Sequence, residues 1–133
     1  MNIVVDTNII ISGIFFGGNP KRIINAILDS KVNAYISKEI LNEYFEIINE
    51  MIFSKGESID LSFISLLIDR FNIIETTSKI DISRDPDDNK FIECAVDSNS
   101  IYIVSGDDDL LSIKNYHNIE IITAKEFCER HLK

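Results

Sequence analysis

Short runs of apolar residues alternate with amphipathic segments along almost the whole chain. The runs at 3–5 and 101–104 are fully or largely apolar, and further short runs occur at 32–36, 72–75 and 119–122. Such runs are typical of buried parallel strands, whereas the segments between them carry apolar residues at helical spacing. Parallel strands joined by helices need right-handed crossovers. The pattern therefore predicts an α/β fold with a mainly parallel central sheet and helices on both faces.

Capping residues mark where the predicted helices begin. Asn, Ser, Asp and Thr are good caps because their side-chain oxygens accept a hydrogen bond from a free N–H of the first turn, and proline suits the first helical position. The predicted helices are 20–30 after Asn19, 38–53 after Ser37, 61–71 after Asp60, 86–97 after Asp85, a short one at 108–113, and a terminal helix that opens with a capping box of Thr123 and Glu126.

Length and composition indicate a globular enzyme-sized unit. The 133 residues predict one domain, 1–133, long enough to bury roughly two-thirds of the unfolded chain's surface. Hydrophobic residues make up 45% and charged residues 26%, which excludes a disordered chain. No apolar run reaches membrane-spanning length and the start lacks a basic signal region, so we expect neither membrane association nor secretion. Cys94 and Cys128 lack zinc-ligand spacing and are expected to be reduced core residues of a cytoplasmic protein.

Two acidic residues follow predicted strands at the same edge of the sheet. Asp6 comes directly after the run 3–5, and Asp107 comes shortly after the run 101–104. In open α/β sheets, ligands collect at the carboxyl ends of the strands. Asp6 could instead cap a following helix or turn, and the triplet 107–109 could be a solvated turn with one aspartate as a helix cap. If the triplet does bind metal, Asp109 is a second candidate ligand beside Asp107.

Two further acids are predicted to lie on helices near that edge. Asp88 falls in the first turn after Asp85, where the helix dipole alone would favour an acid. Glu43 lies at the border of the apolar stripe of helix 38–53, closer to it than Glu46, although most acids of that helix are simply solvated. No histidine or cysteine cluster accompanies these acids. Carboxylates held together repel each other by about 4 kcal/mol per close pair, so a cluster of them predicts Mg²⁺ or Mn²⁺ and chemistry on phosphate esters.

The net charge of −9 argues against binding of nucleic acid through a protein-wide positive field. Two bound divalent cations, carrying +4, would reduce it to −5. Five basic residues remain available to contact phosphates: Lys21, Arg22, Lys79, Arg84 and Lys90. The charge weakens a nucleic-acid function without excluding it, and it also suits a basic protein partner.

Four short motifs, taken together and in this order, resemble those of the PIN-domain ribonucleases, in particular the single-domain prokaryotic toxins of toxin–antitoxin systems (VapC-like proteins). The motifs are Ile3-Val4-Val5-Asp6-Thr7-Asn8, Ile40-Leu41-Asn42-Glu43-Tyr44, Arg84-Asp85-Pro86-Asp87-Asp88-Asn89-Lys90-Phe91 and Val104-Ser105-Gly106-Asp107-Asp108-Asp109-Leu110. The resemblance covers nearly the whole chain. It implies a three-layer α/β/α PIN-like fold with a mainly parallel central sheet.

The resemblance also implies a function and a set of site residues. The expected activity is a metal-dependent endoribonuclease that hydrolyses RNA phosphodiesters, with one or two Mg²⁺ or Mn²⁺ ions. The acids that match the family's ligands are Asp6, Glu43, Asp88 and Asp107. Asn8 and Ser105 match polar residues that support such a site. Members of the family commonly form homodimers and are held inactive by an antitoxin protein that covers the acidic pocket.

Two other classes remain open from the residues. A non-catalytic module with the PIN fold could bind RNA or a protein partner without cutting, although every expected acid is present. A receiver-like signalling domain also gathers aspartates at strand ends around Mg²⁺. Such a domain has two adjacent acids after its first strand and a lysine after its last, and this chain has neither.

Overall fold

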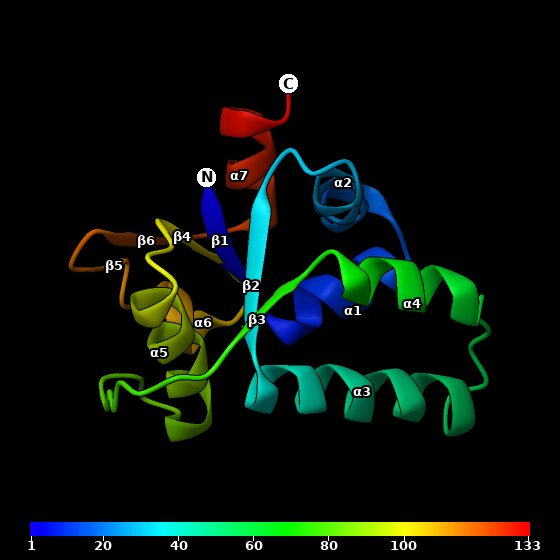
Figure 1. Cartoon of the computed structure of the whole chain (residues 1–133), viewed down its shortest axis with the longest axis horizontal. Coiled ribbons are helices and arrows are strands. Elements are labelled where there is room, and N and C mark those ends of the chain that lie inside the picture. The colour runs from blue at the N-terminus through cyan, green and yellow to red at the C-terminus, as the bar shows by residue number, and fades with distance from the viewer.

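A six-stranded sheet runs through the molecule in the order β3-β2-β1-β4-β6-β5 (Figure 1). The structure is a computed structural model and describes residues 1–133. The strands are β1 (Asn2–Val5), β2 (Asn33–Ser37), β3 (Asn72–Ile74), β4 (Tyr102–Val104), β5 (Asn115–Tyr116) and β6 (Ile119–Ile122). All neighbours pair in parallel except β5, which is antiparallel to β6. The predicted α/β fold with a mainly parallel sheet is confirmed.

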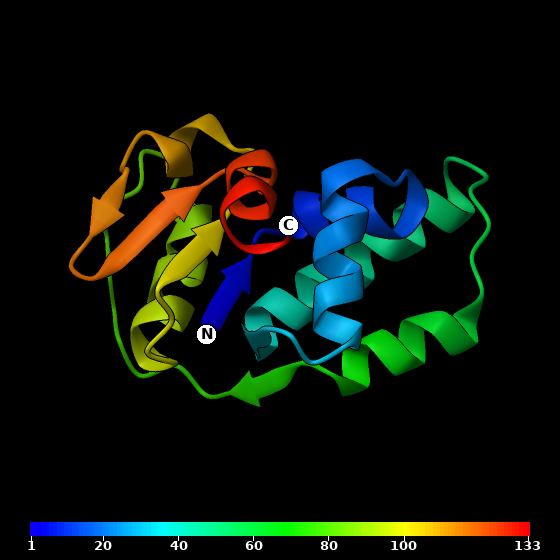
Figure 2. The same ribbon diagram turned by 90° about the horizontal axis from the view of Figure 1, so that it is seen from above.

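The helices are α1 (Thr7–Phe15), α2 (Gly18–Leu28), α3 (Lys38–Phe53), α4 (Leu61–Asp69), α5 (Asn89–Asp97), α6 (Asp108–Leu111) and α7 (Ala124–His131), with a 3₁₀ turn η1 (Pro86–Asp88) before α5. Helix α5 packs against β1, β2 and β4. Figures 1 and 2 place α7 on the opposite face of the strands from α5, and they show α1 to α4 gathered to one side. Helices therefore cover both faces, as predicted.

Register at the centre of the sheet determines where the polar residues emerge. Strand β1 is fully buried from Ile3 to Val5 and pairs with β4 so that Val5 lies opposite Val104. The next residue on each strand is polar, Asp6 on one and Ser105 on the other. The backbone N–H of Asp6 donates to the carbonyl of Val104 at 2.9 Å. The side chains of Asp6 and Ser105 therefore lie next to each other at the carboxyl edge of the sheet.

Most predicted caps are present, and one predicted helix start is wrong. The side chains of Ser37, Asp60 and Asp85 accept first-turn hydrogen bonds, and the capping box of Thr123 and Glu126 is complete. Helix α2 begins at Gly18 rather than after Asn19, because Gly17 with φ of 101° turns the chain into the helix.

Helix α1 and strand β5 were not predicted, and the helix predicted at 86–97 is not continuous. Helix α1 begins directly after Asp6, in a stretch where the sequence shows apolar residues without a helical pattern. The short edge strand β5 is also additional. The predicted helix 86–97 is divided into the 3₁₀ turn η1 (Pro86–Asp88) and α5 (Asn89–Asp97).

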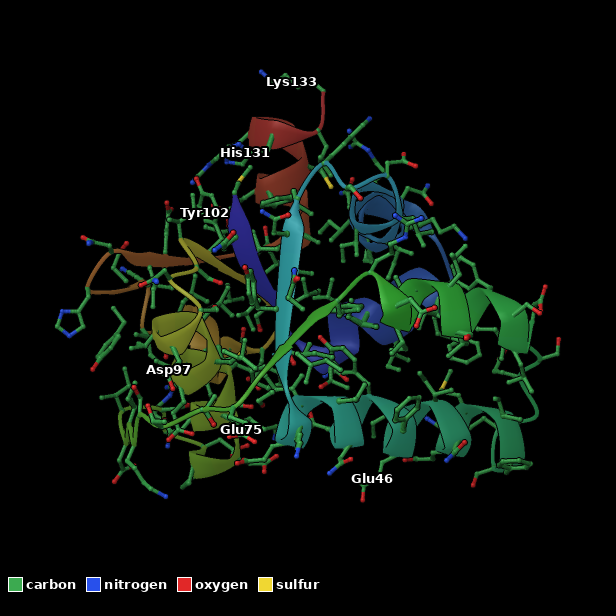
Figure 3. All side chains as sticks on the ribbon, viewed as in Figure 1. Glu46, Glu75, Asp97, Tyr102, His131 and Lys133 are labelled. Carbon is green, nitrogen blue, oxygen red and sulfur yellow. The ribbon has the colours of Figure 1, made fainter.

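Helix α3 is fixed to the central strand by a buried tyrosine. Tyr44 is fully buried, and its hydroxyl donates a 2.6 Å hydrogen bond to the carbonyl of Val5. A second, smaller core of Ile11, Ile48, Met51 and Ile64 joins α1, α3 and α4. Figure 3 shows the side chains filling the space between these helices and the sheet. Cys94 and Cys128 are buried and free, as expected, and none of the helices has the length and apolarity needed to cross a bilayer.

Candidate metal centre

The four acids singled out from the sequence line one cavity at the carboxyl edge of the sheet. This cavity, the acidic pocket, has a volume of about 190 Å³. Its lining residues are Asp6, Thr7, Asn8, Glu43, Ile47, Asp87, Asp88, Phe91 and Asp107. They come from the residue after β1, the start of α1, the middle of α3, the segment η1–α5 and the loop after β4. The structure therefore brings Asp6, Glu43, Asp88 and Asp107 together, whereas Asp109 is not part of the lining.

Ser105 connects the two acids that follow strands. Its buried hydroxyl donates to Asp6 Oδ2 at 2.7 Å and accepts from the backbone N–H of Asp107 at 2.9 Å. Asp6 is only 4% exposed, and this burial raises its pKa, as do the charges of Asp107 and Glu43. The hydrogen bonds from Ser105 and from the backbone of Asn8 act in the other direction. Both residues thus stabilise the ionised form of Asp6.

Asp88 is the least compensated carboxylate of the pocket. It is 7% exposed, and its Oδ2 is buried without any hydrogen-bond partner. Burial, the neighbouring Asp107 and the charges of Asp6 and Asp85 together raise its pKa to about 8, with burial as the largest cause. A buried acceptor without a donor is unfavourable, and the charge of Asp107 beside it makes ionisation more so. An oxygen-preferring divalent cation would remove both penalties, so these residues fit Mg²⁺ or Mn²⁺.

Glu43 lies in a different environment, because both of its oxygens already have partners. Oε1 is 2.9 Å from the ammonium nitrogen of Lys90, and Oε2 accepts a short hydrogen bond from the hydroxyl of Thr7. Lys90 also contacts Asp87, at 3.0 Å from Oδ2 and 2.8 Å from its carbonyl oxygen. Lys90 was expected to be available for phosphates, and the structure instead shows its ammonium group enclosed by these carboxylates.

Asp109 lies just outside the pocket, on the first turn of α6. Its Oδ1 is 3.0 Å from Arg84 Nε, and its backbone N–H donates to Asp107 Oδ1 at 2.9 Å. One oxygen each of Asp85, Asp88 and Asp109 lie within 4.8 Å of one another, an arrangement that could hold a cation. The sequence had assigned Asp85 only a capping role. A ligand role for Asp109 stays a prediction.

Three contacts of the site were missed from the sequence. Thr7 stands next to Asp6, but its contact with Glu43 depends on α1, which was not predicted. The pairing of Lys90 with Asp87 has the three-residue spacing of helical ion pairs and could have been recognised. Its contact with Glu43 depends on how α3 and α5 are placed and has no signal in the sequence.

An α/β fold with a carboxylate pocket at the carboxyl edge of its sheet is thus established, and the comparisons place it in a family. Residues 2–109 match the PIN domain family, and the chain belongs to this family. It is 31% identical over 145 residues to the uncharacterized protein MJ1680 of Methanocaldococcus jannaschii, an alignment that covers 100% of this chain and 93% of that protein.

A solved structure shares the fold at low sequence identity. It is a chain of the crystal structure of VapBC2 from Rickettsia felis bound to a DNA fragment from their promoter. The TM-score is 0.63 with 15% identity, and the match covers 92% of this chain and 98% of that one. The family resemblance and the PIN-like three-layer fold predicted from the four motifs are confirmed.

Proposed function

We propose that this protein is a metal-dependent endoribonuclease that hydrolyses RNA phosphodiesters with Mg²⁺ or Mn²⁺ bound in the acidic pocket. The observation that carries the proposal is the buried, unpartnered Oδ2 of Asp88 beside Asp6 and Asp107. Asp6, Asp88 and Asp107 line one pocket, and the charges of Asp6 and Asp107 oppose the ionisation of Asp88, so a divalent cation bound there would relieve this repulsion. Membership of the PIN family supports the nuclease class.

The side chains of the pocket divide into ligands and the groups that position them. Asp6, Asp88 and Asp107 would hold the ion, with Glu43 completing the acidic lining, and Ser105 would orient Asp6. A bound ion supplies a water of lowered pKa and neutralises charge on the phosphodiester. The carboxylates themselves would repel an RNA backbone, so substrate binding as well as cleavage is expected to require the cation.

The proposal is tested by RNA cleavage with the purified protein. A panel of single-stranded and structured RNAs would be incubated with wild type, Asp6→Asn and Asp69→Asn in Mg²⁺, Mn²⁺ or EDTA. Asp69 is an exposed residue at the end of α4 and serves as the control. We expect wild type and Asp69→Asn to cut only with metal, and Asp6→Asn to be folded and inactive. Metal-dependent cutting by Asp6→Asn would contradict the proposed site.

A toxin role with an antitoxin partner is supported by the shared fold with a chain of VapBC2. A partner that inserts an arginine or lysine into the acidic pocket would compete with the metal for the same carboxylates. Homodimerisation is part of this proposal, and large apolar side chains are exposed where α3 leads to α4, including Phe53 at 82% and Leu61 at 71%. Light scattering at several concentrations would test the dimer. Growth arrest on expression of wild type, and none with Asp6→Asn, would support a toxin.

The alternative is a PIN-fold module that binds RNA or a protein without cutting. The complete set of acids in the pocket favours an enzyme over this alternative. Retarded RNA in a gel-shift assay, with no cleavage by a metal-loaded wild type, would favour the binding module.

A further inference from the structure

The ammonium group of Lys90 is built into the wall of the acidic pocket. Its side chain is 10% exposed, although lysine is ordinarily a surface residue. An ammonium group has three protons to donate, and three oxygens surround this one: Glu43 Oε1 at 2.9 Å, Asp87 Oδ2 at 3.0 Å and the carbonyl of Asp87 at 2.8 Å. Lys90 therefore has a complete set of acceptors and no donor left for a solvent-facing role.

The two ends of the pocket differ in what their carboxylates still need. At the Lys90 end, both oxygens of Glu43 are occupied, one by Lys90 and the other by Thr7. At the opposite end, Asp88 Oδ2 has no partner, and Asp88 is crowded by Asp107 and Asp6. The unmet demand for positive charge is thus confined to the end formed by Asp6, Asp88 and Asp107.

We propose that Lys90 is the fixed cation of the Glu43 end of the pocket, so that Glu43 is held by Lys90 and the pocket binds a single divalent ion through Asp6, Asp88 and Asp107. This inference rests on the proposed function, since it assumes that the pocket binds metal. It makes Lys90 a positioning residue that determines how many ions the site accepts.

Charge supports this division of the pocket. Glu43 and Asp87 face one ammonium group, and Asp6, Asp88 and Asp107 face none. A second divalent ion bound at Glu43 would approach the ammonium group at contact distance and would be repelled by it. Lys90 could leave only by exposing three acceptors that the fold brings together from α3 and η1. The ammonium group and a second ion therefore exclude each other.

The test is the number of Mn²⁺ ions bound per chain, measured from the free-ion signal by electron paramagnetic resonance and by calorimetry. Wild type is expected to bind one ion. Lys90→Met, which keeps the length of the stem but removes the charge, is expected to bind two. The double variant Lys90→Met/Glu43→Gln is expected to return to one ion, because the second position then lacks its carboxylate.

A second variant keeps the inference falsifiable if Lys90→Met does not fold. Glu43→Gln alone is expected to bind one ion with an affinity within about threefold of wild type, whereas loss of that ion would make Glu43 a direct ligand and overturn the inference. Two ions in wild type, or one ion in a folded Lys90→Met, would also overturn it and leave a metal-dependent nuclease standing. No Mn²⁺ bound to wild type would overturn both the inference and the proposed metal dependence.

Discussion

Ser105 donates a 2.7 Å hydrogen bond to Asp6, and this contact joins the carboxyl ends of β4 and β1 beside the acidic pocket. Both residues follow fully buried strand positions that pair in register, Val104 with Val5. The same hydroxyl accepts the backbone N–H of Asp107. A single side chain therefore orients one proposed ligand and the loop that carries another.

Replacing Ser105 by alanine is expected to weaken Mn²⁺ binding by about 10- to 100-fold, the usual effect of removing a group that orients a metal ligand. Asp6 would lose its side-chain donor, and the N–H of Asp107 would lose its acceptor. Ser105→Thr, which keeps the hydroxyl, is the matched control and is expected to bind nearly as wild type does. Calorimetry with Mn²⁺ would measure both. Equal affinities for the alanine and threonine variants would show that the hydroxyl has no positioning role.

The pKa of Asp88 predicts how the stability of the metal-free protein changes with pH. Burial, followed by the neighbouring carboxylates of Asp107, Asp6 and Asp85, raises this pKa from an ordinary value of 3.8 to about 8. Between these values the folded chain holds a proton that the unfolded chain has lost, so the free energy of unfolding falls as the pH rises through this window and levels off above it. Melting temperatures measured in EDTA from pH 5 to pH 9 are expected to decline accordingly.

Asp88→Asn supplies the control for this pH dependence. The amide cannot ionise, so its melting temperature should change less between pH 5 and pH 8, and it should exceed that of wild type most clearly above pH 8. Metal binding requires the ionised carboxylate, so the Mn²⁺ affinity of wild type is expected to rise about tenfold per pH unit below 8. Parallel melting curves for wild type and Asp88→Asn would mean that another group titrates in this range.

Asp109 and Asp107 are expected to differ in their importance for the metal. Asp107 lines the acidic pocket, whereas Asp109 is 37% exposed at its side chain and is held by Arg84. We expect Asp107→Asn to abolish Mn²⁺ binding and Asp109→Asn to reduce it by less than about tenfold, since Asp109 would act mainly through charge near the surface. An equal loss in both variants would make Asp109 a ligand, as the sequence suggested.

The hydroxyl of Tyr44 is expected to contribute about 1–2 kcal/mol to the free energy of unfolding. Removing it in Tyr44→Phe leaves the carbonyl of Val5 buried without its 2.6 Å donor, and such a group carries a penalty of this size. The melting temperature should fall by about 3–8 °C. Tyr35→Phe, which removes a hydroxyl from β2 away from the site, is the comparison. A loss of equal size in Tyr35→Phe would remove the special role assigned to Tyr44.

Much of the fold follows from local rules, and the parts that do not are explained by packing. The run 3–5 predicts a strand because all its side chains are apolar, and the run 119–122 predicts one because three of its four residues are isoleucine. Ser37 and Asp60 predict helix starts by their caps. Helix α1 could not be predicted in this way. Ile9, Ile10 and Ile11 are all buried, so the helix has no polar face and the sequence shows no helical period. Its helical form depends on the neighbours that surround it.

The same distinction applies to the acidic pocket. Asp6 and Asp107 could be predicted because the ends of parallel strands meet at one edge, and Glu43 because it borders an apolar stripe. The ion pair of Lys90 with Glu43 could not be predicted, since it joins two helices whose relative placement is decided by the core between them. Local pattern thus predicts which residues reach the edge but not which of them neutralise one another there.

Gly13 lies where α1 packs against α2, and a side chain at this position would clash. A Cβ at this position would lie 2.6 Å from Ile24 Cγ1 and 2.7 Å from the carbonyl oxygen of Pro20. Alanine is the better helix former by about 1 kcal/mol, but the Pro20 carbonyl belongs to the backbone and cannot rotate away. We expect Gly13→Ala to destabilise the protein by about 1–3 kcal/mol, measured by chemical denaturation.

Gly106→Ala is the matched control, because the nearest atom to its added Cβ is Ile9 Cδ1 at an ordinary contact distance of 3.8 Å. This variant is expected to lie within about 0.5 kcal/mol of wild type, as a substitution without a clash usually does. Because α1 begins immediately after Asp6 and carries Thr7, a shift of α1 in Gly13→Ala should also weaken Mn²⁺ binding. Unchanged stability in Gly13→Ala would mean that α1 and α2 can separate without affecting the sheet edge.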